Sequence, residues 1–129
     1  MAALSCIVVT PEDTALEEST DFVVVPLYDG ELGIGVNHSP MIGRLGYGEL
    51  RLGRSGGERY FVEGGFVQVE GNVVSVLTNA LRKASDIDLS AAESLLQETK
   101  SMPVATEEEL VAREEKVSQA RAQIRMSRR

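Results

Sequence analysis

The sequence predicts an antiparallel β-sandwich over residues 1–84 followed by an antiparallel α-helical hairpin over residues 85–129, that is, an all-β domain with an α-helical appendage. Two observations lead to this fold class. All twelve glycines lie between Gly30 and Gly71, and glycine is typical of tight turns between strands, whereas its absence favours helix. In addition, apolar residues alternate with polar ones in the first part of the chain but recur at helical spacing from Asp86 onward.

Runs of aliphatic and β-branched residues predict the strands. Such runs at close spacing, separated by turn-forming residues, are typical of an antiparallel sandwich or barrel. Pro26 has no amide hydrogen to donate to a neighbouring strand, so it predicts an edge strand or a bulge near the end of the second run. Gly71-Asn72 predicts a hairpin turn between the last two runs. The expected strands cover residues 4–10, 21–27, 48–54, 59–63, 65–70 and 72–78.

Capping patterns mark the starts of two helices. Asp86, Asp88 or Ser90 is expected to cap the first helix. Thr106 and Glu109 have capping-box spacing at the start of a second helix, expected over residues 107–126. Both helices carry thin apolar stripes, so the pair is marginal by itself and is expected to dock in more than one place. The stripes comprise Leu89, Ala92, Leu95, Leu96 and Thr99 in the first helix and Leu110, Val117, Ala120 and Ile124 in the second.

The charge of the chain is negative overall and unevenly distributed. The formal net charge is -7 and the sequence pI is about 4.7. This balance argues against nucleic-acid binding, whose affinity comes from Lys and Arg contacts with phosphate. No Lys or Arg precedes Arg44, while six basic residues lie between Arg113 and the end of the chain. The basic tail is therefore suited to an acidic partner.

The residue patterns of catalysis, metal binding and cofactor binding are missing from the sequence. The one cysteine, Cys6, lies in an apolar run and is expected to be a small buried side chain, and the one histidine, His38, has no second ligand type nearby to complete a metal site. Neither a glycine-rich phosphate loop nor a nucleophile elbow is present. The N-terminus does not have the pattern of a signal peptide, and no apolar stretch reaches the ~20 residues that span a bilayer. We therefore expect a soluble binding or regulatory module rather than an enzyme.

Two blocks of the sequence resemble a known family. The segment Gly30–Pro40, GELGIGVNHSP, is similar to the epsilon-subunit signature of F-type ATP synthases, which reads approximately GELGILPGHAP. The second block resembles the GGFLEV..N.VTVL pattern of the same family. Val36-Asn37 stands where the family usually has Pro-Gly; asparagine is the residue other than glycine that best tolerates positive φ, so the turn is expected to survive. The second block comprises Gly64, Gly65, Phe66, Val69, Asn72, Val74, Val76 and Leu77.

The resemblance implies a non-catalytic central-stalk (rotor) subunit that couples proton-driven rotation of the c-ring to ATP synthesis. The implied partners are the gamma subunit and the c-ring, and the implied place is peripheral, on the cytoplasmic face of a bacterial inner membrane or the equivalent organelle face. By itself the chain is expected to be a monomer, with no cofactor. Glu31 and His38, in the first block, are the expected partner contacts of the sandwich.

In the resembled family the hairpin either folds against the sandwich or extends toward the acidic contact region of the catalytic alpha/beta head, where it inhibits ATP hydrolysis. A solvated face with pairs such as Glu109–Arg113 is the alternative for the basic residues. Some members bind ATP through an I-D-x-x-R-A motif; here Ala91 stands in the place of its arginine, so ATP binding is expected to be weak or absent. The basic residues expected to contact the head are Arg113, Lys116, Arg121, Arg125 and Arg128.

Two other classes of protein remain open from the residues. One is a free-standing β-sandwich adaptor or ligand-binding module that dimerises through Leu110, Val117 and Ile124 of its helical tail. The other is a small hydrolase, against which the missing nucleophile–base pattern counts. Self-association of the isolated chain would favour the adaptor.

Overall fold

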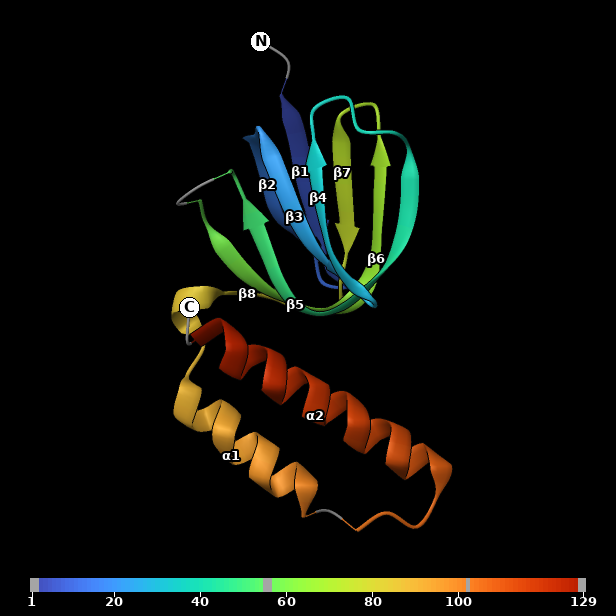
Figure 1. Ribbon diagram of the computed structural model, residues 1–129, viewed down its shortest axis with the longest axis vertical. Coiled ribbons are helices and arrows are strands. Elements are labelled where there is room, and N and C mark those ends of the chain that lie inside the picture. The colour runs from blue at the N-terminus through green and yellow to red at the C-terminus, as the bar shows by residue number, and fades with distance from the viewer. Residues whose placement is uncertain (1–2, 55–56, 102, 128–129) are drawn as a thin grey trace. The chain divides into compact units, whose positions relative to one another are not determined.

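A computed structural model describes residues 3–54, 57–101 and 103–127. The chain divides into two compact units, Met1–Lys83 and Ala84–Arg129. The first is built from strands, and the second from a short 3-10 turn, η1 (Ala84–Asp86), and two helices, α1 (Leu89–Lys100) and α2 (Glu107–Ser127) (Figure 1). The described strands are β1 (Leu4–Val9), β2 (Thr14–Thr20), β3 (Phe22–Leu27), β4 (Gly30–Gly35), β5 (Met41–Leu52), β6 (Arg59–Glu70), β7 (Val73–Leu77) and β8 (Leu81–Lys83).

The strands form one hydrogen-bonded sheet in the order β2-β1-β7-β6-β5-β3-β4, with β8 paired to β6. Two long strands, β5 and β6, let this sheet fold over into a sandwich, as their strong curvature shows (Figure 1). In β6, residues 66–70 pair with β7, whereas residues 60–62 pair with β8. Gly64 and Gly65 lie between these two parts with φ of +69° and +110°, which glycine adopts without the Cβ strain of other residues. The predicted fold class, a β-sandwich followed by two helices, is confirmed.

The core of the sandwich is aliphatic. Alternate residues of β1, namely Leu4, Cys6 and Val8, are fully buried, as are Val67 and Val69 of β6 and their neighbours on β7. Cys6 is a small buried hydrophobe, as expected. Burial raises the pKa of its thiol to about 12, with a smaller contribution from the nearby Glu18 carboxylate. With few aromatic residues, the chain fills the space between the layers mainly with valine and leucine.

Three strands were not predicted. β2 and β4 are the two ends of the sheet order, and β8 is only three residues long. The β2 segment is polar and largely exposed, and β4 is rich in glycine, so neither has the apolar alternation of a strand. In addition, β5 begins at Met41 rather than at Gly48, and the runs 59–63 and 65–70 are one continuous strand. These segments become strands because neighbouring strands supply their hydrogen bonds.

Pro26 lies within β3, between β4 and β5, rather than on an edge strand. The pairing of β3 with β5 shifts its register between Val24 and Leu27, so Pro26 falls in the irregular part of that pairing. The bulge alternative is therefore confirmed and the edge alternative is wrong. The Gly71-Asn72 turn is also confirmed, since both residues have φ near +60° and join β6 to β7.

The second unit is an antiparallel pair of helices (Figure 1). Among the three candidates, Asp88 caps α1: its Oδ1 accepts hydrogen bonds from the amides of Ser90 at 2.8 Å and Ala91 at 3.3 Å. Thr106 Oγ1 accepts a hydrogen bond from the backbone amide of Glu109, in the first turn of α2, at 3.1 Å, as predicted for a capping box. The Glu109 carboxylate accepts a hydrogen bond from the backbone amide of Ala105, rather than from that of Thr106.

The apolar stripes of the hairpin are confirmed over most of their length. Ala92, Thr99 and Ala120 are buried, and the other residues of the stripes apart from Leu110 are partly buried. Three further residues of α2 that the predicted stripe did not include are also buried, namely Ala122, Gln123 and Met126. Leu110 is an exception at 40 % exposed. With 21 residues, α2 is longer than α1 with 12, and its first turns, which include Leu110, precede the point where it meets the end of α1. Over the described part of the chain, neither helix has the length and hydropathy of a membrane-spanning segment.

Candidate partner-binding surfaces

The first block of the family resemblance forms β4 and the turn that leads to β5. Asn37, in this turn, has φ of +66°, which confirms that asparagine takes the positive φ expected there. Its amide donates to Oδ1 of Asn72 at 2.6 Å, and Nδ2 of Asn72 donates to Oδ1 of Asn37 at 3.3 Å. This reciprocal pair joins the 36–40 turn to the β6–β7 turn, so the two resembling blocks are in direct contact.

His38 is partly exposed in the same turn. Its amide donates to the carbonyl oxygen of Gly35 at 3.3 Å, and its Nδ1 lies 2.8 Å from the carbonyl oxygen of Ser39. Because a carbonyl oxygen only accepts, Nδ1 carries the hydrogen in this arrangement. The ring is thereby held against its own turn.

Glu31, on β4, lies at one end of a row of alternating charges. Its carboxylate is 3.3 Å from Nη1 of Arg51, which is also 3.5 Å from Oε1 of Glu49. Arg59 completes the row with two hydrogen bonds to Glu49, Nε to Oε1 at 3.0 Å and Nη2 to Oε2 at 2.9 Å. This bonding raises the pKa of the Arg59 guanidinium. The row anchors Glu31, while its side chain stays 48 % exposed.

An exposed apolar row crosses four strands of the sandwich, and the sequence analysis did not predict it. Val9, Leu77 and Phe66 are direct cross-strand neighbours on β1, β7 and β6, and they are 36 %, 51 % and 57 % exposed. Ile42, on the adjacent β5, is 74 % exposed. An apolar group of this kind on an outer face is typical of an interaction surface. We call Val9, Ile42, Phe66 and Leu77 the apolar row.

One arginine lies within this surface. Arg44 is the cross-strand neighbour of Phe66, and its guanidinium carbon lies 4.5 Å from the ring centroid of Tyr28. The cation is thus held over an aromatic face beside the apolar row. The missed sequence signal was that outward-facing positions of β5, β6 and β7, which alternation assigns to polar residues, carry Ile42, Phe66 and Leu77.

The described basic residues of the hairpin differ in their surroundings. Arg113 donates to the carbonyl oxygens of Thr99 at 3.1 Å and Lys100 at 3.0 Å, at the end of α1. The expected Glu109–Arg113 pair is absent from the ion pairs of the described residues, so this prediction is wrong. The Glu109 carboxylate instead accepts a hydrogen bond from the amide of Ala105. Lys116 is exposed. Arg128 lies outside the described residues.

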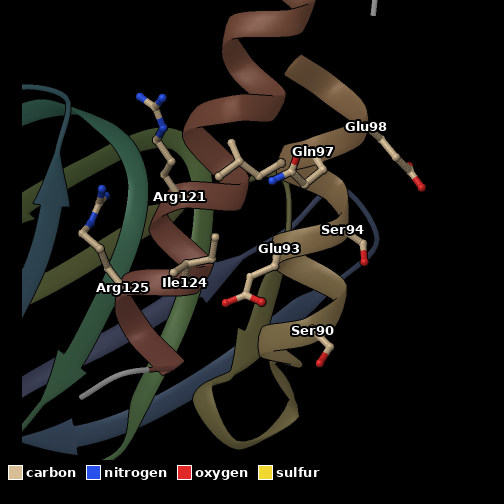
Figure 2. Close-up of a pocket in the computed structure, with 9 residues that line it drawn as sticks. Ser90, Glu93, Ser94, Gln97, Glu98, Arg121, Ile124 and Arg125 are labelled. Atoms are coloured by element: carbon tan, nitrogen blue, oxygen red, sulfur yellow. The ribbon is translucent and has the colours of Figure 1, made fainter. Parts of the chain in front are cut away.

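Arg121 and Arg125 border an open groove of about 930 Å³ between α1 and α2. Figure 2 shows Ile124 and Gln97 directed toward the space between the helices, whereas the side chains of Arg121 and Arg125 leave α2 on the side away from α1. The two guanidinium groups therefore do not converge with the serines of α1 on one point. Over the described residues, no group of three or more His, Cys, Asp or Glu side chains is placed to hold a metal ion.

An exposed apolar row, an anchored but half-exposed carboxylate and basic side chains on a helical hairpin are features typical of proteins that bind other proteins. Residues 3–84 match the family model described as ATP synthase, Delta/Epsilon chain, beta-sandwich domain. A protein of Rhodopirellula baltica called ATP synthase epsilon chain is 49 % identical over 127 residues, covering 98 % of this chain and 99 % of the relative. The epsilon chain of Symbiobacterium thermophilum is 44 % identical over 94 residues, covering 71 % and 68 %. The chain therefore belongs to the ATP synthase delta/epsilon chain family.

Solved structures share the fold. A chain in the OSCP/F1/c-ring structure of the Euglena gracilis mitochondrial ATP synthase matches with a TM-score of 0.86 at 19 % identity, covering all of this chain and 83 % of the other. A chain in the central stalk/c-ring structure of the Tetrahymena thermophila mitochondrial ATP synthase matches with a TM-score of 0.75 at 14 % identity, covering 96 % of each. The resemblance stated from the two sequence blocks is confirmed, and it favours the epsilon-subunit interpretation over the adaptor and the hydrolase.

Proposed function

We propose that this chain is the non-catalytic epsilon subunit of an ATP synthase and works in its central stalk, coupling rotation of the c-ring to ATP synthesis in the catalytic head. The observation that carries this proposal is the 49 % identity, over nearly the full length of both chains, to a protein named ATP synthase epsilon chain. The fold adds support, because the similar solved chains come from ATP synthase assemblies whose titles name the c-ring and the central stalk.

The apolar row is the surface through which the sandwich binds the gamma subunit in this proposal. Its exposed side chains, Phe66 and Ile42 above all, lose contact with water when a partner covers them, and this gives a favourable free energy that increases with the buried area. Arg44, beside the row, suits a partner that places a carboxylate there. Glu31 and His38 are the proposed contacts with the polar loops of the c-ring.

A tagged pull-down from detergent-solubilised membranes tests the proposal. The parental chain should recover gamma, the c-ring and the alpha and beta subunits. Phe66→Ser should reduce this recovery about tenfold, since it removes a large exposed contact from a central position. Gln68→Ser is the matched control, because Gln68 is an exposed polar residue on the same face of β6. Recovery of the parental chain without these subunits would overturn the proposed function.

We further propose that the hairpin inhibits ATP hydrolysis when it extends toward the catalytic head. Lys116, Arg121, Arg125 and Arg128 supply the positive charge for the acidic contact region of the head. Deleting the residues after Asp86 should raise ATP hydrolysis by the assembled enzyme and leave assembly intact. Unchanged hydrolysis would remove the inhibitory role while leaving the coupling role in place.

Weak or absent ATP binding by the isolated chain is also part of the proposal. Ala91 offers no guanidinium to a phosphate, and Asp88 is engaged as the cap of α1. The outward direction of Arg121 and Arg125 adds support (Figure 2). Titration calorimetry with ATP should detect no binding at micromolar concentrations, and a clear micromolar isotherm would contradict this expectation.

The proposed location follows from the partners. As part of the complex the chain is peripheral to a membrane, on the cytoplasmic face of a bacterial inner membrane or on the equivalent face in an organelle. Protease added to intact, right-side-out cells should leave it uncut, and protease added to inverted membrane vesicles should cut it. Cleavage in intact cells would place it on the opposite face.

A further inference from the structure

Arg113 is bound within the hairpin. Although it belongs to α2, both of its hydrogen bonds go to the end of α1, from Nε to the carbonyl oxygen of Thr99 at 3.1 Å and from Nη2 to that of Lys100 at 3.0 Å. The planar guanidinium thus bridges two successive carbonyl groups. A lysine could not reproduce this geometry, because its ammonium group is a single compact donor rather than a planar fork.

The end of α1 needs these hydrogen bonds. The last four carbonyl groups of a helix have no partner within the helix. In α1 the amide and the hydroxyl of Ser101 bond to the carbonyl of Gln97. Arg113 bonds to the last two, and the Thr99 carbonyl also accepts a backbone N–H of the C-cap. Thr99 is only 1 % exposed, so water does not readily replace the guanidinium at its carbonyl. A positive charge at this position also interacts favourably with the negative end of the α1 dipole.

The apolar contact between the helices is weak by comparison. The fully buried residues of the two stripes, Ala92, Thr99 and Ala120, are small or partly polar. The larger apolar residues of the stripes are only partly buried or exposed; they are Leu89, Leu95, Leu96, Leu110, Val117 and Ile124. Small side chains bury little apolar area, so they contribute little to the free energy of helix pairing. The two charge-assisted hydrogen bonds of Arg113 are therefore a large part of what holds the two helices together.

We infer that Arg113 sets the equilibrium between packed and separated helices, and that its guanidinium can contact another protein only after the helices have separated. The first part concerns the hairpin alone. The second part rests on the proposed function and changes the role expected for Arg113 from the sequence. Arg113 is a contact that keeps the hairpin closed, and a carboxylate of a partner would have to compete with the carbonyls of Thr99 and Lys100 for it.

The distance between the helices in the full isolated chain tests the inference. Spin labels at Ser94→Cys on α1 and Ser118→Cys on α2, both exposed positions, report this distance by pulsed electron paramagnetic resonance. Buried Cys6 is replaced by alanine throughout, so that only the introduced thiols are labelled. Three variants are compared with the parent: Arg113→Gln, Arg113→Lys, and the control Lys116→Gln, which removes one positive charge from an exposed position three residues further along α2.

Arg113→Gln should raise the ratio of separated to packed helices about tenfold, Arg113→Lys should raise it less, and Lys116→Gln should leave it unchanged. Equal distance distributions for Arg113→Gln and the parent, or an equal shift for Lys116→Gln, would overturn the inference. Far-UV circular dichroism shows whether the helices persist. If the Arg113→Gln variant has less helix than the parent, the Arg113→Lys variant is used in its place. A ratio of separated to packed helices above that of the parent then supports the inference, and a ratio equal to that of the parent overturns it. Because no partner is present, this result does not depend on the pull-down that tests the proposed function.

Discussion

Asn37 and Asn72 lie 35 positions apart in the chain, both with positive φ, and each accepts a hydrogen bond from the other through its side-chain oxygen. Positive φ costs most residues roughly 1–2 kcal/mol, and asparagine less. The pair fixes the turn that carries His38 against the β6–β7 turn. The position of His38, a proposed partner contact, therefore depends on this hydrogen-bonded pair between two turns of the sandwich.

Two substitutions separate the parts of this arrangement. Asn72→Gly keeps the positive φ and removes the two hydrogen bonds, so the free energy of unfolding should fall by about 1 kcal/mol. Asn72→Ala removes the same bonds and adds backbone strain at a residue with positive φ. The free energy of unfolding of this variant should therefore be about 1 kcal/mol lower than that of Asn72→Gly. Urea denaturation followed by circular dichroism measures both values. Equal free energies of unfolding of the two variants would mean that positive φ at position 72 does not strain an alanine.

The row of charges predicts a contrast between two glutamates. Glu49 has a side chain only 3 % exposed and a two-bond pairing with Arg59, so Glu49→Gln leaves a cation without its buried partner and should reduce the free energy of unfolding by about 3 kcal/mol. Glu31→Gln, at the exposed end of the same row, should cost less than about 1 kcal/mol. Thermal unfolding of the two variants provides the comparison. Similar losses would mean that Glu49 is hydrated despite its burial.

The bend in β6 predicts a contrast between two glycines. A Cβ at Gly65 would lie 1.8 Å from the carbonyl oxygen of Leu77, a backbone atom, so Gly65→Ala should cost about 3 kcal/mol or more or prevent folding. Gly71 also has positive φ, but a Cβ there would meet no atom within 4 Å. Gly71→Ala should therefore cost only about 1 kcal/mol. The fraction of soluble, folded protein and the melting temperature of each variant give the measurement.

Cys6 predicts a loss of stability at alkaline pH. The thiol has a pKa of 9.0 when unperturbed and about 12 in the folded chain, mainly because of its burial. Between these values the unfolded chain loses the thiol proton while the folded chain retains it, so stability is complete below pH 9 and falls as the pH rises toward 12. At pH 10.5 the loss from this group should be about 2 kcal/mol.

The difference between the parent and Cys6→Ala isolates this effect from other groups that titrate at high pH, such as Tyr60, whose pKa is also raised by burial and by its hydrogen bond to Glu58. The free energy of unfolding of both chains is measured from pH 7 to 11. The gap between them should change by about 2 kcal/mol from pH 8 to pH 10.5. A gap that stays constant over this range would mean that the folded thiol titrates normally.

Much of the fold could be predicted because its signals are local. The β-branched runs that became β1, β3 and β7, and the capping residues Asp88 and Thr106, act on neighbours within a few positions. Of the proposed contacts, Glu31 and His38 belong to one contiguous motif, which forms β4 and the turn that follows it. The apolar row was missed because its members come from four strands and meet only when those strands are in register.

The sequence by itself determined where strands give way to helices, since glycine content and apolar period change there, and it determined that Asn37 could hold a turn with positive φ. Only the tertiary structure decided that the polar β2 and the glycine-rich β4 are strands, that Phe66 and Leu77 lie side by side on an exposed face, and that Arg113 bonds to the end of α1. The physical reason is that each of these features depends on a hydrogen bond or contact with a residue distant in the chain. Neither the propensity nor the periodicity of a local segment contains that information.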